Sequence, residues 1–287
     1  MGLSSFDELY RDAPPEQREL LRDFRATHPH QHTSVNGVAW EYIASGQGDQ
    51  AVLILGGGLS VGESSFRNIL RLEKRYRVLS PSYPPVGKMG PVADGLSAIL
   101  QEHGFARAHI IRHSLGAGVG HAFIRLQPDR VEKLVLNAFG LYTPAHVRSA
   151  KLFLKLPVGL LMGYYRRAFK RLLAKADDAD QRFYAIYTNE VMTRLHTPQT
   201  LKGQFKLLMD IFDNADEYGV LRPVERAGKV LLVLAEDDKG FTAEERQALK
   251  DTYPGAQVHS FASGGHLAAF QRRAEFDALV DRFLDLP

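Results

Sequence analysis

The chain has 287 residues and a formal net charge of +3, with 45% hydrophobic and 24% charged residues. These values are ordinary for a globular protein with a large core, and they carry no nucleic-acid signature. The chain has no cysteine, which excludes disulfides, thiolate metal sites and a cysteine nucleophile.

The amino-terminal residues show no targeting pattern. Residues 1–12 lack a basic segment followed by an apolar one, so we expect no secretory signal. No run of 18 uncharged apolar residues predicts a membrane span. We therefore expect a cytoplasmic protein.

Residues 5–27 predict one or two helices, the second opened by Pro14-Pro15. His28, His30 and His32 follow at alternate positions. Three histidines at this spacing are a weak metal-site pattern. We interpret them as part of a solvated linker, because the intervening proline extends the chain and no carboxylate is close in sequence.

Strands and helices then alternate along most of the chain. Residues 33–45 predict a β-hairpin that turns at Asn36-Gly37. Further strands are expected at 51–55, 76–80, 108–112, 131–137, 230–235 and 257–261. Helices are expected at 64–72, 91–103, 115–126, 243–252 and 271–284. The alternation predicts an α/β fold with a doubly wound, mostly parallel sheet.

A long helical insertion interrupts this pattern. The predicted organisation is an amino-terminal helical extension (1–32), a core (33–140 and 223–287) and a helical cap (141–222). Residues 148–175 contain eight basic and no acidic residues, interleaved with apolar ones. We interpret this segment as a cap whose apolar face covers a pocket and whose basic face meets solvent. Contact with an anionic lipid surface is a second interpretation, to which we give less weight.

A serine stands at the junction between the strand at 108–112 and the helix at 115–126. The sequence Arg112-His113-Ser114-Leu115-Gly116 approximates the G-x-S-x-G nucleophile elbow, a sharp turn that projects the serine hydroxyl. A serine nucleophile needs a base, a group that orients the base, and hydrogen-bond donors for the oxyanion.

Each of these groups has a candidate downstream of a predicted strand. The candidate base is His266, because it follows the last strand at the edge where open α/β sheets form their sites. The candidate orienting acid is Asp238, with Glu236 and Asp237 as competing neighbours. Asn137 ends another core strand, but its amide cannot stabilise an imidazolium as a charge does.

The candidate oxyanion donors are backbone N–H groups. One is that of Leu115, and the other comes from the turn Gly56-Gly57-Gly58-Leu59 after the first buried strand. A glycine-rich turn can also cradle a phosphate, but no Gly-Lys-Ser/Thr or Gly-x-Gly-x-x-Gly pattern is present. We expect no cofactor and no metal.

Together, the glycine-rich turn, His113-Ser114-Leu115-Gly116, Asp238 and Gly265-His266 resemble the α/β-hydrolase superfamily, of the kind with a helical cap, over residues 33–287. The chain order Ser…Asp…His is that of the superfamily. The resemblance implies that Ser114 is the nucleophile, His266 the general base and Asp238 its orienter. It places Gly58 and Leu115 at the oxyanion positions. It favours Asp238 over Asp237, because Ala235 holds the place of a glycine found three residues before the acid.

Arg112 departs from the elbow pattern, which has a glycine there. Burying an unpaired charge costs several kcal/mol, and three interpretations are open. An acidic partner accommodates the arginine, the elbow is distorted and catalysis is weakened, or this is an altered position in an ordinary active enzyme. A distorted elbow predicts that Arg112→Gly raises esterase activity.

The sequence therefore predicts a carboxylesterase-like serine hydrolase that cleaves an ester, thioester or lactone of a mainly hydrophobic small molecule through an acyl-enzyme. Amidases, carbon–carbon hydrolases and cofactor-free lyases use the same constellation. Haloalkane dehalogenases and epoxide hydrolases are disfavoured, because a carboxylate replaces the serine in both. The alternative, motivated by Arg112, is a non-catalytic or weakly active binding protein on this fold. We expect no nucleic-acid partner, and the oligomeric state is not predicted.

Overall fold

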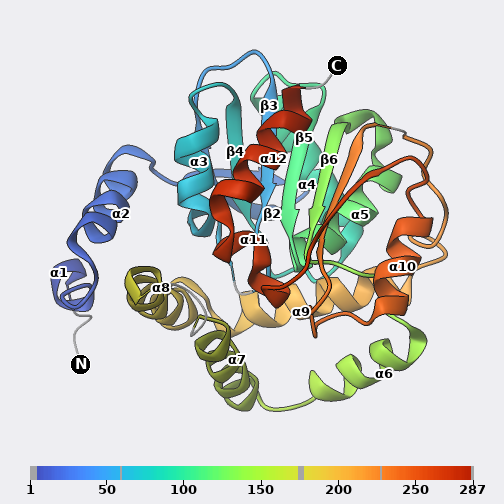
Figure 1. Ribbon diagram of the computed structural model, residues 1–287. Helices are drawn as coiled ribbons and strands as arrows, with labels where there is room; N and C mark the ends of the chain where they lie inside the picture. Colours follow the sequence, from blue (N-terminus) through green and yellow to red (C-terminus); the bar gives the residue numbers. More distant parts are fainter. Residues whose placement is uncertain (1–4, 59, 174–177, 227, 286–287) are drawn as a thin grey trace.

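A mixed sheet forms the centre of the molecule (Figure 1). The computed structural model describes residues 5–58, 60–173, 178–226 and 228–285. Eight strands in this part pair in the order β1-β2-β4-β3-β5-β6-β7-β8. They are β1 (Gln31–Val35), β2 (Val38–Ser45), β3 (Ala51–Leu55), β4 (Arg77–Ser82), β5 (Ala108–His113), β6 (Val131–Asn137), β7 (Val230–Ala235) and β8 (Gln257–Phe261).

The burial of the strands agrees with their direction. Strands β1 and β2 are antiparallel to their neighbours, whereas β4, β3, β5, β6, β7 and β8 run parallel to one another. Every residue of β3 and of β7 is buried, as expected for parallel strands covered on both faces. The predicted doubly wound, mostly parallel sheet is confirmed.

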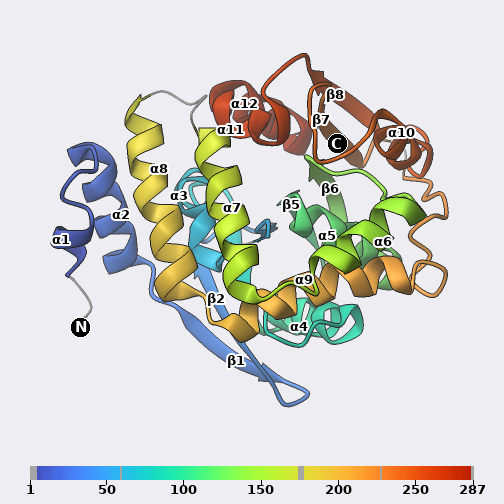
Figure 2. The same ribbon diagram turned by 90° about the horizontal axis from the view of Figure 1, so that it is seen from below.

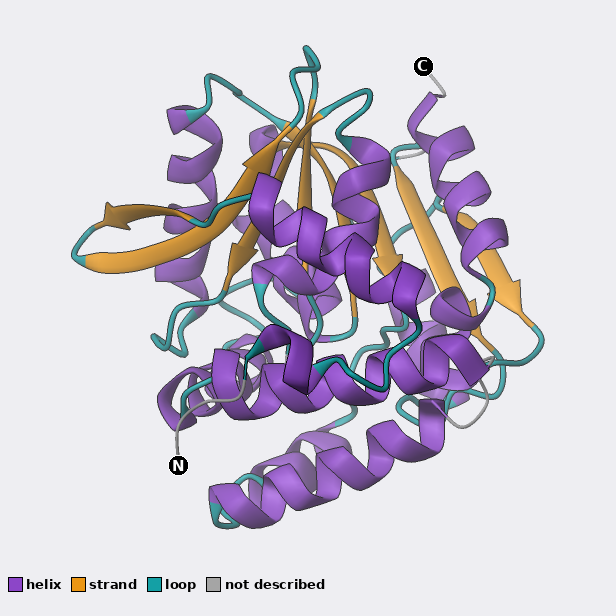
Figure 3. Cartoon of the chain, turned by 90° about the vertical axis from the view of Figure 1, so that its left-hand side faces the viewer, coloured by secondary structure: helices purple, strands orange, loops and turns teal. Residues whose placement is uncertain are grey.

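Strands β1 and β2 form the predicted hairpin, whose tip extends beyond the rest of the sheet (Figure 3). Val35 pairs with Val38 across a two-residue turn. Both turn residues have positive φ, 51° at Asn36 and 79° at Gly37. Such a turn requires residues that tolerate the left-handed region, which explains the Asn-Gly pair.

Helices cover both faces of the sheet and build two apolar cores. One core lies between the sheet and helices α4 and α5, and the other between the sheet and helices α2, α3 and α12. The core helices and the amino-terminal pair are α1 (Phe6–Leu9), α2 (Pro15–Thr27), α3 (Phe66–Leu72), α4 (Met89–Glu102), α5 (Leu115–Leu126), α10 (Ala243–Asp251), α11 (Ala268–Gln271) and α12 (Arg273–Asp285).

A helical insertion separates β6 from β7. It contains α6 (Pro144–Phe153), α7 (Val158–Leu173), α8 (Asp178–Glu190), the π-helical turn η3 (Val191–Leu195) and α9 (Pro198–Asp213). Helix α9 lies under the sheet against α4 and α5, and α6 and α7 lie farther out (Figure 1). No helix of the described part is long and apolar enough to cross a bilayer.

The amino-terminal helices pack beside α8 (Figure 2) and join it to the core through paired charges. Arg25 donates to Glu63, in the short turn η1 (Gly62–Ser65), at 2.6 Å, and to Glu190 of α8 at 2.8 Å. Tyr10 donates its hydroxyl to Glu190 at 2.5 Å. Both carboxylates are buried, so each needs these partners.

The solvated-linker interpretation of the histidine run is wrong for His28, whose side chain is largely buried, whereas His30 is exposed but also has a carboxylate partner. His28 lies 2.7 Å from a Glu73 oxygen, and His30 lies 3.0 Å from a Glu41 oxygen. His32 belongs to β1. The carboxylate partners come from distant parts of the chain, which is why the local sequence did not reveal them.

Replacing His30 with glutamine is expected to destabilise the protein in a pH-dependent way. Hydrogen bonds to Glu41 and Glu63 raise the pKa of His30 to about 9. Protonated His30 therefore stabilises the folded state. This contribution to the free energy of unfolding is fully present below the unfolded pKa of about 6.5 and disappears as the pH rises through 9. After allowance for solvent screening, we expect His30→Gln to lower the free energy of unfolding by about 1 kcal/mol at pH 6 and to leave it unchanged at pH 10. Urea unfolding at both pH values measures it, and an equal loss at both would contradict the assignment.

Candidate active site

Ser114 occupies a strained turn between β5 and α5. Its φ is 52° and its ψ is −119°, a conformation that non-glycine residues rarely adopt. Gly116 makes the turn feasible, because a Cβ there would lie 2.3 Å from the carbonyl oxygen of Leu55 and 2.5 Å from that of Gly56. Helix α5 therefore begins so close to the end of β3 that no side chain fits at position 116.

The structure brings together the three side chains singled out in the sequence. The Oγ of Ser114 lies 2.9 Å from Nε2 of His266, and Nδ1 of His266 lies 3.0 Å from Oδ2 of Asp238. The three residues follow β5, β8 and β7, respectively. Carboxyl ends of parallel strands share one edge of the sheet, which places residues separated by up to 152 positions in contact.

Asp238 and Asp237 have different hydrogen-bond partners. Asp238 holds the imidazole, whereas Asp237 accepts backbone hydrogen bonds from Gly264 (3.3 Å) and Gly265 (2.7 Å). Asp237 thus fixes the loop that carries His266. The two acids are adjacent in sequence, and only the fold separates their contacts.

The carboxyl of Asp238 stays ionised. Burial alone would raise its pKa, but the hydrogen bond and charge of His266, with the N–H of Gly240, outweigh burial and lower it. Gly240 donates to Oδ1 of Asp238 at 2.7 Å. A Cβ at Gly240 would lie 3.0 Å from that oxygen and 3.1 Å from Nδ1 of His266. Gly240 was not identified from the sequence, where only its place two residues after the acid could have indicated it.

Asn137 contacts His113 instead of the candidate base. Its amide nitrogen lies 3.0 Å from Nδ1 of His113, whose ring centre is 5.2 Å from that of His266. Burial lowers the pKa of His113 to about 3, with a further decrease from His266 and an opposing effect of Asp238. His113 is therefore neutral and adds no positive charge beside the base.

The glycine-rich turn lies against the elbow. A Cβ at Gly57 would lie 3.2 Å from the His113 ring, and one at Gly58 would lie 3.9 Å from Cβ of Leu115. Tyr83 donates its hydroxyl to the carbonyl of Gly56 at 3.2 Å and anchors the turn. Leu59, the last residue of this turn, lies outside the described residues. The oxyanion roles of Gly58 and Leu115 remain a prediction.

Arg112 is accommodated without an acidic partner in the described part of the chain. It is 2% exposed, and one of its terminal nitrogens donates to the carbonyl of Gly116 at 3.0 Å. The guanidinium lies over Gly120, where a Cβ would come within 1.5 Å of it. Burial lowers the pKa of Arg112 to about 9. The interpretation that an acid accommodates Arg112 is wrong for the described structure. The missing side chain of Gly120 leaves the space, the carbonyl of Gly116 accepts one hydrogen bond, and Nε and the other terminal nitrogen have no hydrogen-bond partner there.

Gly120→Ala is expected to reverse the sign of its effect when Arg112 is shortened. In the natural chain, the added methyl overlaps the guanidinium and costs about 2 kcal/mol of unfolding free energy. In an Arg112→Ala background, alanine in a helix should instead stabilise by roughly 1 kcal/mol relative to glycine. Urea unfolding of the four proteins measures the coupling. An equal cost in both backgrounds would show that Arg112 does not occupy this space.

An aromatic wall extends from His266 into the insertion. Phe241 lies 6.1 Å from the His266 ring, and Phe139 and Tyr142 lie 5.5 and 5.3 Å from Phe241. Tyr142 stacks at 4.6 Å on Phe212 of α9. This side of the site is therefore apolar.

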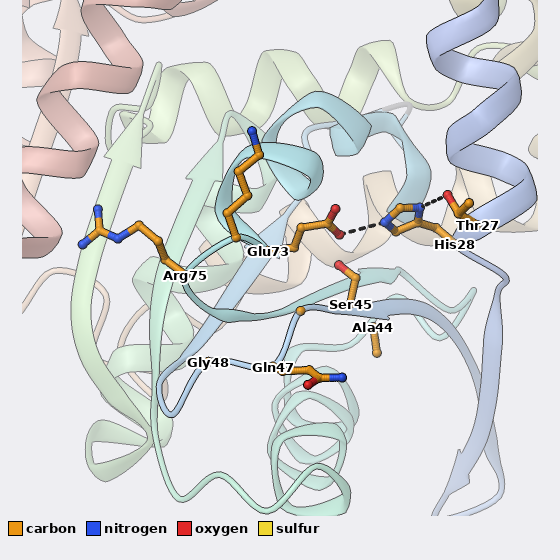
Figure 4. Close-up of a pocket in the computed structure, with 10 residues that line it drawn as sticks. Thr27, His28, Ala44, Ser45, Gln47, Gly48, Glu73 and Arg75 are labelled. Carbon is orange, nitrogen blue, oxygen red and sulfur yellow. Dashed lines mark hydrogen bonds and ion pairs between the residues drawn. The ribbon is translucent and has the colours of Figure 1, made fainter.

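Two hollows of the described surface lie away from the three residues. The larger, about 710 Å³, is formed by residues that precede β3 and β4, together with the end of α2 (Figure 4). It therefore lies at the opposite edge of the sheet from Ser114. The smaller, about 200 Å³, is lined by residues that include Ser60 and Tyr83, and none of the three residues lines it.

Comparisons with known proteins agree with this architecture. A family model described as "Alpha/beta hydrolase family" matches residues 51–279. A 2-hydroxy-6-oxononadienedioate/2-hydroxy-6-oxononatrienedioate hydrolase of Cupriavidus pinatubonensis is 26% identical, over 84% of this chain and 88% of its own. A meta-cleavage product hydrolase of Pseudomonas fluorescens superposes with a TM-score of 0.68, at 20% identity over 89% of this chain and 97% of its own. An enol-lactonase of Burkholderia xenovorans superposes with a TM-score of 0.68, at 18% identity over 89% of this chain and 100% of its own.

Proposed function

The chain belongs to the alpha/beta hydrolase family, and from this premise we propose that it is a serine hydrolase of an ester, thioester or lactone of a mainly hydrophobic small molecule. The observation that carries the proposal is the continuous contact from Ser114 through His266 to Asp238, at 2.9 and 3.0 Å. These distances are those of hydrogen bonds between a nucleophile, its base and the group that orients the base.

The reaction has two halves. Ser114 Oγ attacks the substrate carbonyl carbon while His266 Nε2 takes the hydroxyl proton. His266 then returns this proton to the leaving oxygen or sulfur as its bond to the acyl carbon breaks. Water then attacks the acyl carbon while His266 takes its proton, and His266 returns that proton to Ser114 Oγ as the bond between Oγ and the acyl carbon breaks, which releases the acid. Asp238 keeps the imidazole in the required tautomer and stabilises the imidazolium.

The surroundings of the site support an apolar acyl group. The aromatic wall that includes Phe241 and Tyr142 favours a hydrophobic substrate. We further propose that residues 141–222 form a cap over this site.

A second candidate is hydrolysis of a carbon–carbon bond next to a ketone. It is favoured by the activity for which the Cupriavidus relative is named and by the structural likeness to the Pseudomonas meta-cleavage product hydrolase. Ser114 would attack the ketone, and His266 would supply the proton that the leaving carbon takes up. The relative's substrate is named as a dicarboxylate.

A direct comparison of substrates separates the two candidates. We would measure kcat/KM for p-nitrophenyl acetate, butyrate and octanoate, a γ-lactone, and 2-hydroxy-6-oxo-6-phenylhexa-2,4-dienoate. The proposal expects a burst of p-nitrophenol and the highest kcat/KM on a longer acyl ester. A kcat/KM for the dienoate that is about 100-fold above the best ester or lactone would establish the second candidate instead. No turnover, with no labelling of Ser114 by a fluorophosphonate, would favour a non-catalytic binding protein.

A further inference from the structure

The tip of the insertion carries apolar side chains that the proposed reaction does not use. Helices α6 and α7 lie at the bottom of Figure 1, away from the sheet, and face the viewer in Figure 2. Four of the eight large apolar side chains exposed in the described part lie here. They are Leu152 (69% exposed), Leu156 (43%), Leu160 (61%) and Tyr164 (57%).

These four side chains come from the end of α6, the loop that follows it and the first two turns of α7. Leu160 and Tyr164 are one turn apart on the same face of α7. Leu152 is near the end of α6, and Leu156 lies in the loop between the two helices. Exposed leucines in such a group are costly in water unless another surface covers them.

Basic side chains precede, interrupt and follow these apolar residues in the sequence. The six that are exposed and have no ion-pair partner among the described residues are Arg148, Lys155, Arg166, Arg167, Lys170 and Arg171. Lys151 differs, because it pairs with Asp213. Lys175, the last basic residue of the segment, lies outside the described residues. We call the four apolar and six basic side chains the tip surface.

We propose that the tip surface docks on an anionic phospholipid bilayer. The four apolar side chains would enter the boundary between headgroups and acyl chains, while the flanking cations would contact lipid phosphates. A nucleic acid would neutralise the cations but offers no apolar layer to the leucines. A second copy of this chain would bring like charges together. The exposure of the apolar residues favours lipid contact, and the fold shows this exposure whereas the sequence does not.

Flotation with vesicles tests the proposal in the full chain. We would compare phosphatidylcholine vesicles with vesicles containing about 30% phosphatidylglycerol, at low and high salt. Each lysine or arginine near an anionic surface strengthens binding by roughly fivefold. We therefore expect binding to the anionic vesicles to be at least about tenfold stronger, and to weaken as salt rises. No binding to either vesicle would overturn the proposal.

Matched variants separate docking by the tip surface from general attraction. Leu156→Asp with Leu160→Asp should reduce binding at least about tenfold, whereas Leu20→Asp with Leu221→Asp, at two exposed leucines elsewhere, makes the same change in net charge and should not. Arg166→Glu with Arg167→Glu should also reduce it, whereas Arg11→Glu with Lys74→Glu makes the same change in net charge and should not. Equal loss in the control pair would overturn the proposal. The proposal would also be overturned if the natural chain and the leucine variant bound heparin equally and neither bound vesicles, because the cations would then attract any polyanion without docking on a bilayer.

The outcome does not depend on the proposed reaction. A Ser114→Ala protein should float with the vesicles as the natural chain does. Failure of docking and failure of catalysis are therefore read from different experiments.

Discussion

Ser114→Ala is expected to lower kcat/KM for the best ester by about 10⁴- to 10⁶-fold. The variant removes the atom that would form the acyl-enzyme, while the oxyanion donors and the binding surface remain and support a small residual rate. A fluorophosphonate should label the natural chain once per molecule and leave the variant unlabelled. Because the loss of one oxygen requires little rearrangement around Ser114, the circular dichroism spectrum should not change.

The control is Ser263→Ala, a serine in the loop that leads to His266 and exposed to solvent. Its hydroxyl accepts a hydrogen bond from Arg272 and contacts neither His266 nor Asp238 in the described structure. We expect its activity to stay within about twofold of the natural chain. Residual activity of Ser114→Ala within about tenfold of the natural chain would refute Ser114 as the nucleophile.

Asp238→Asn is expected to lower kcat by about 10⁴-fold. The asparagine amide can donate to Nδ1 of His266, which would leave the proton on Nε2 and remove the acceptor that Ser114 needs. The substitution also removes the negative charge that stabilises the imidazolium. The measurement is kcat on the best ester, with unfolding in urea to show that the variant remains folded.

Asp237→Asn provides a matched control one residue away. Asp237 contacts the backbone of Gly264 and Gly265 rather than the imidazole. An asparagine oxygen can still accept one of these hydrogen bonds, so we expect a loss of about tenfold or less. A larger loss for Asp237→Asn than for Asp238→Asn would reverse the assignment of the two carboxylates.

Local patterns in the sequence predicted the fold and the position of the candidate site. The fully apolar run at 51–55 indicated a strand buried on both faces, and Asn36-Gly37 indicated a two-residue turn. Alternating strands and helices predict a parallel sheet, and parallel strands place their carboxyl ends at one edge. Ser114, Asp238 and His266 each follow such a strand, so their proximity could be expected from chain order alone.

Contacts between distant side chains could not be predicted in the same way. Asp237 and Asp238 have the same side chain, so their chemistry alone does not separate them. The resemblance favoured Asp238, and the path of the chain places Asp238 against His266. The space for Arg112 is made by the absent side chain of Gly120, in the helix that follows the elbow. The carboxylates that pair with His28 and His30 lie on other elements.

The sequence by itself therefore determined the order of elements, the strained turn at Ser114 and the edge of the sheet where the candidate site lies. Those features depend on backbone conformation and burial, which short-range patterns encode. Only the tertiary structure decided which partner each buried charge has, and that the leucines of the insertion face outward. Partners and exposure depend on how whole elements pack, and no local pattern carries that information.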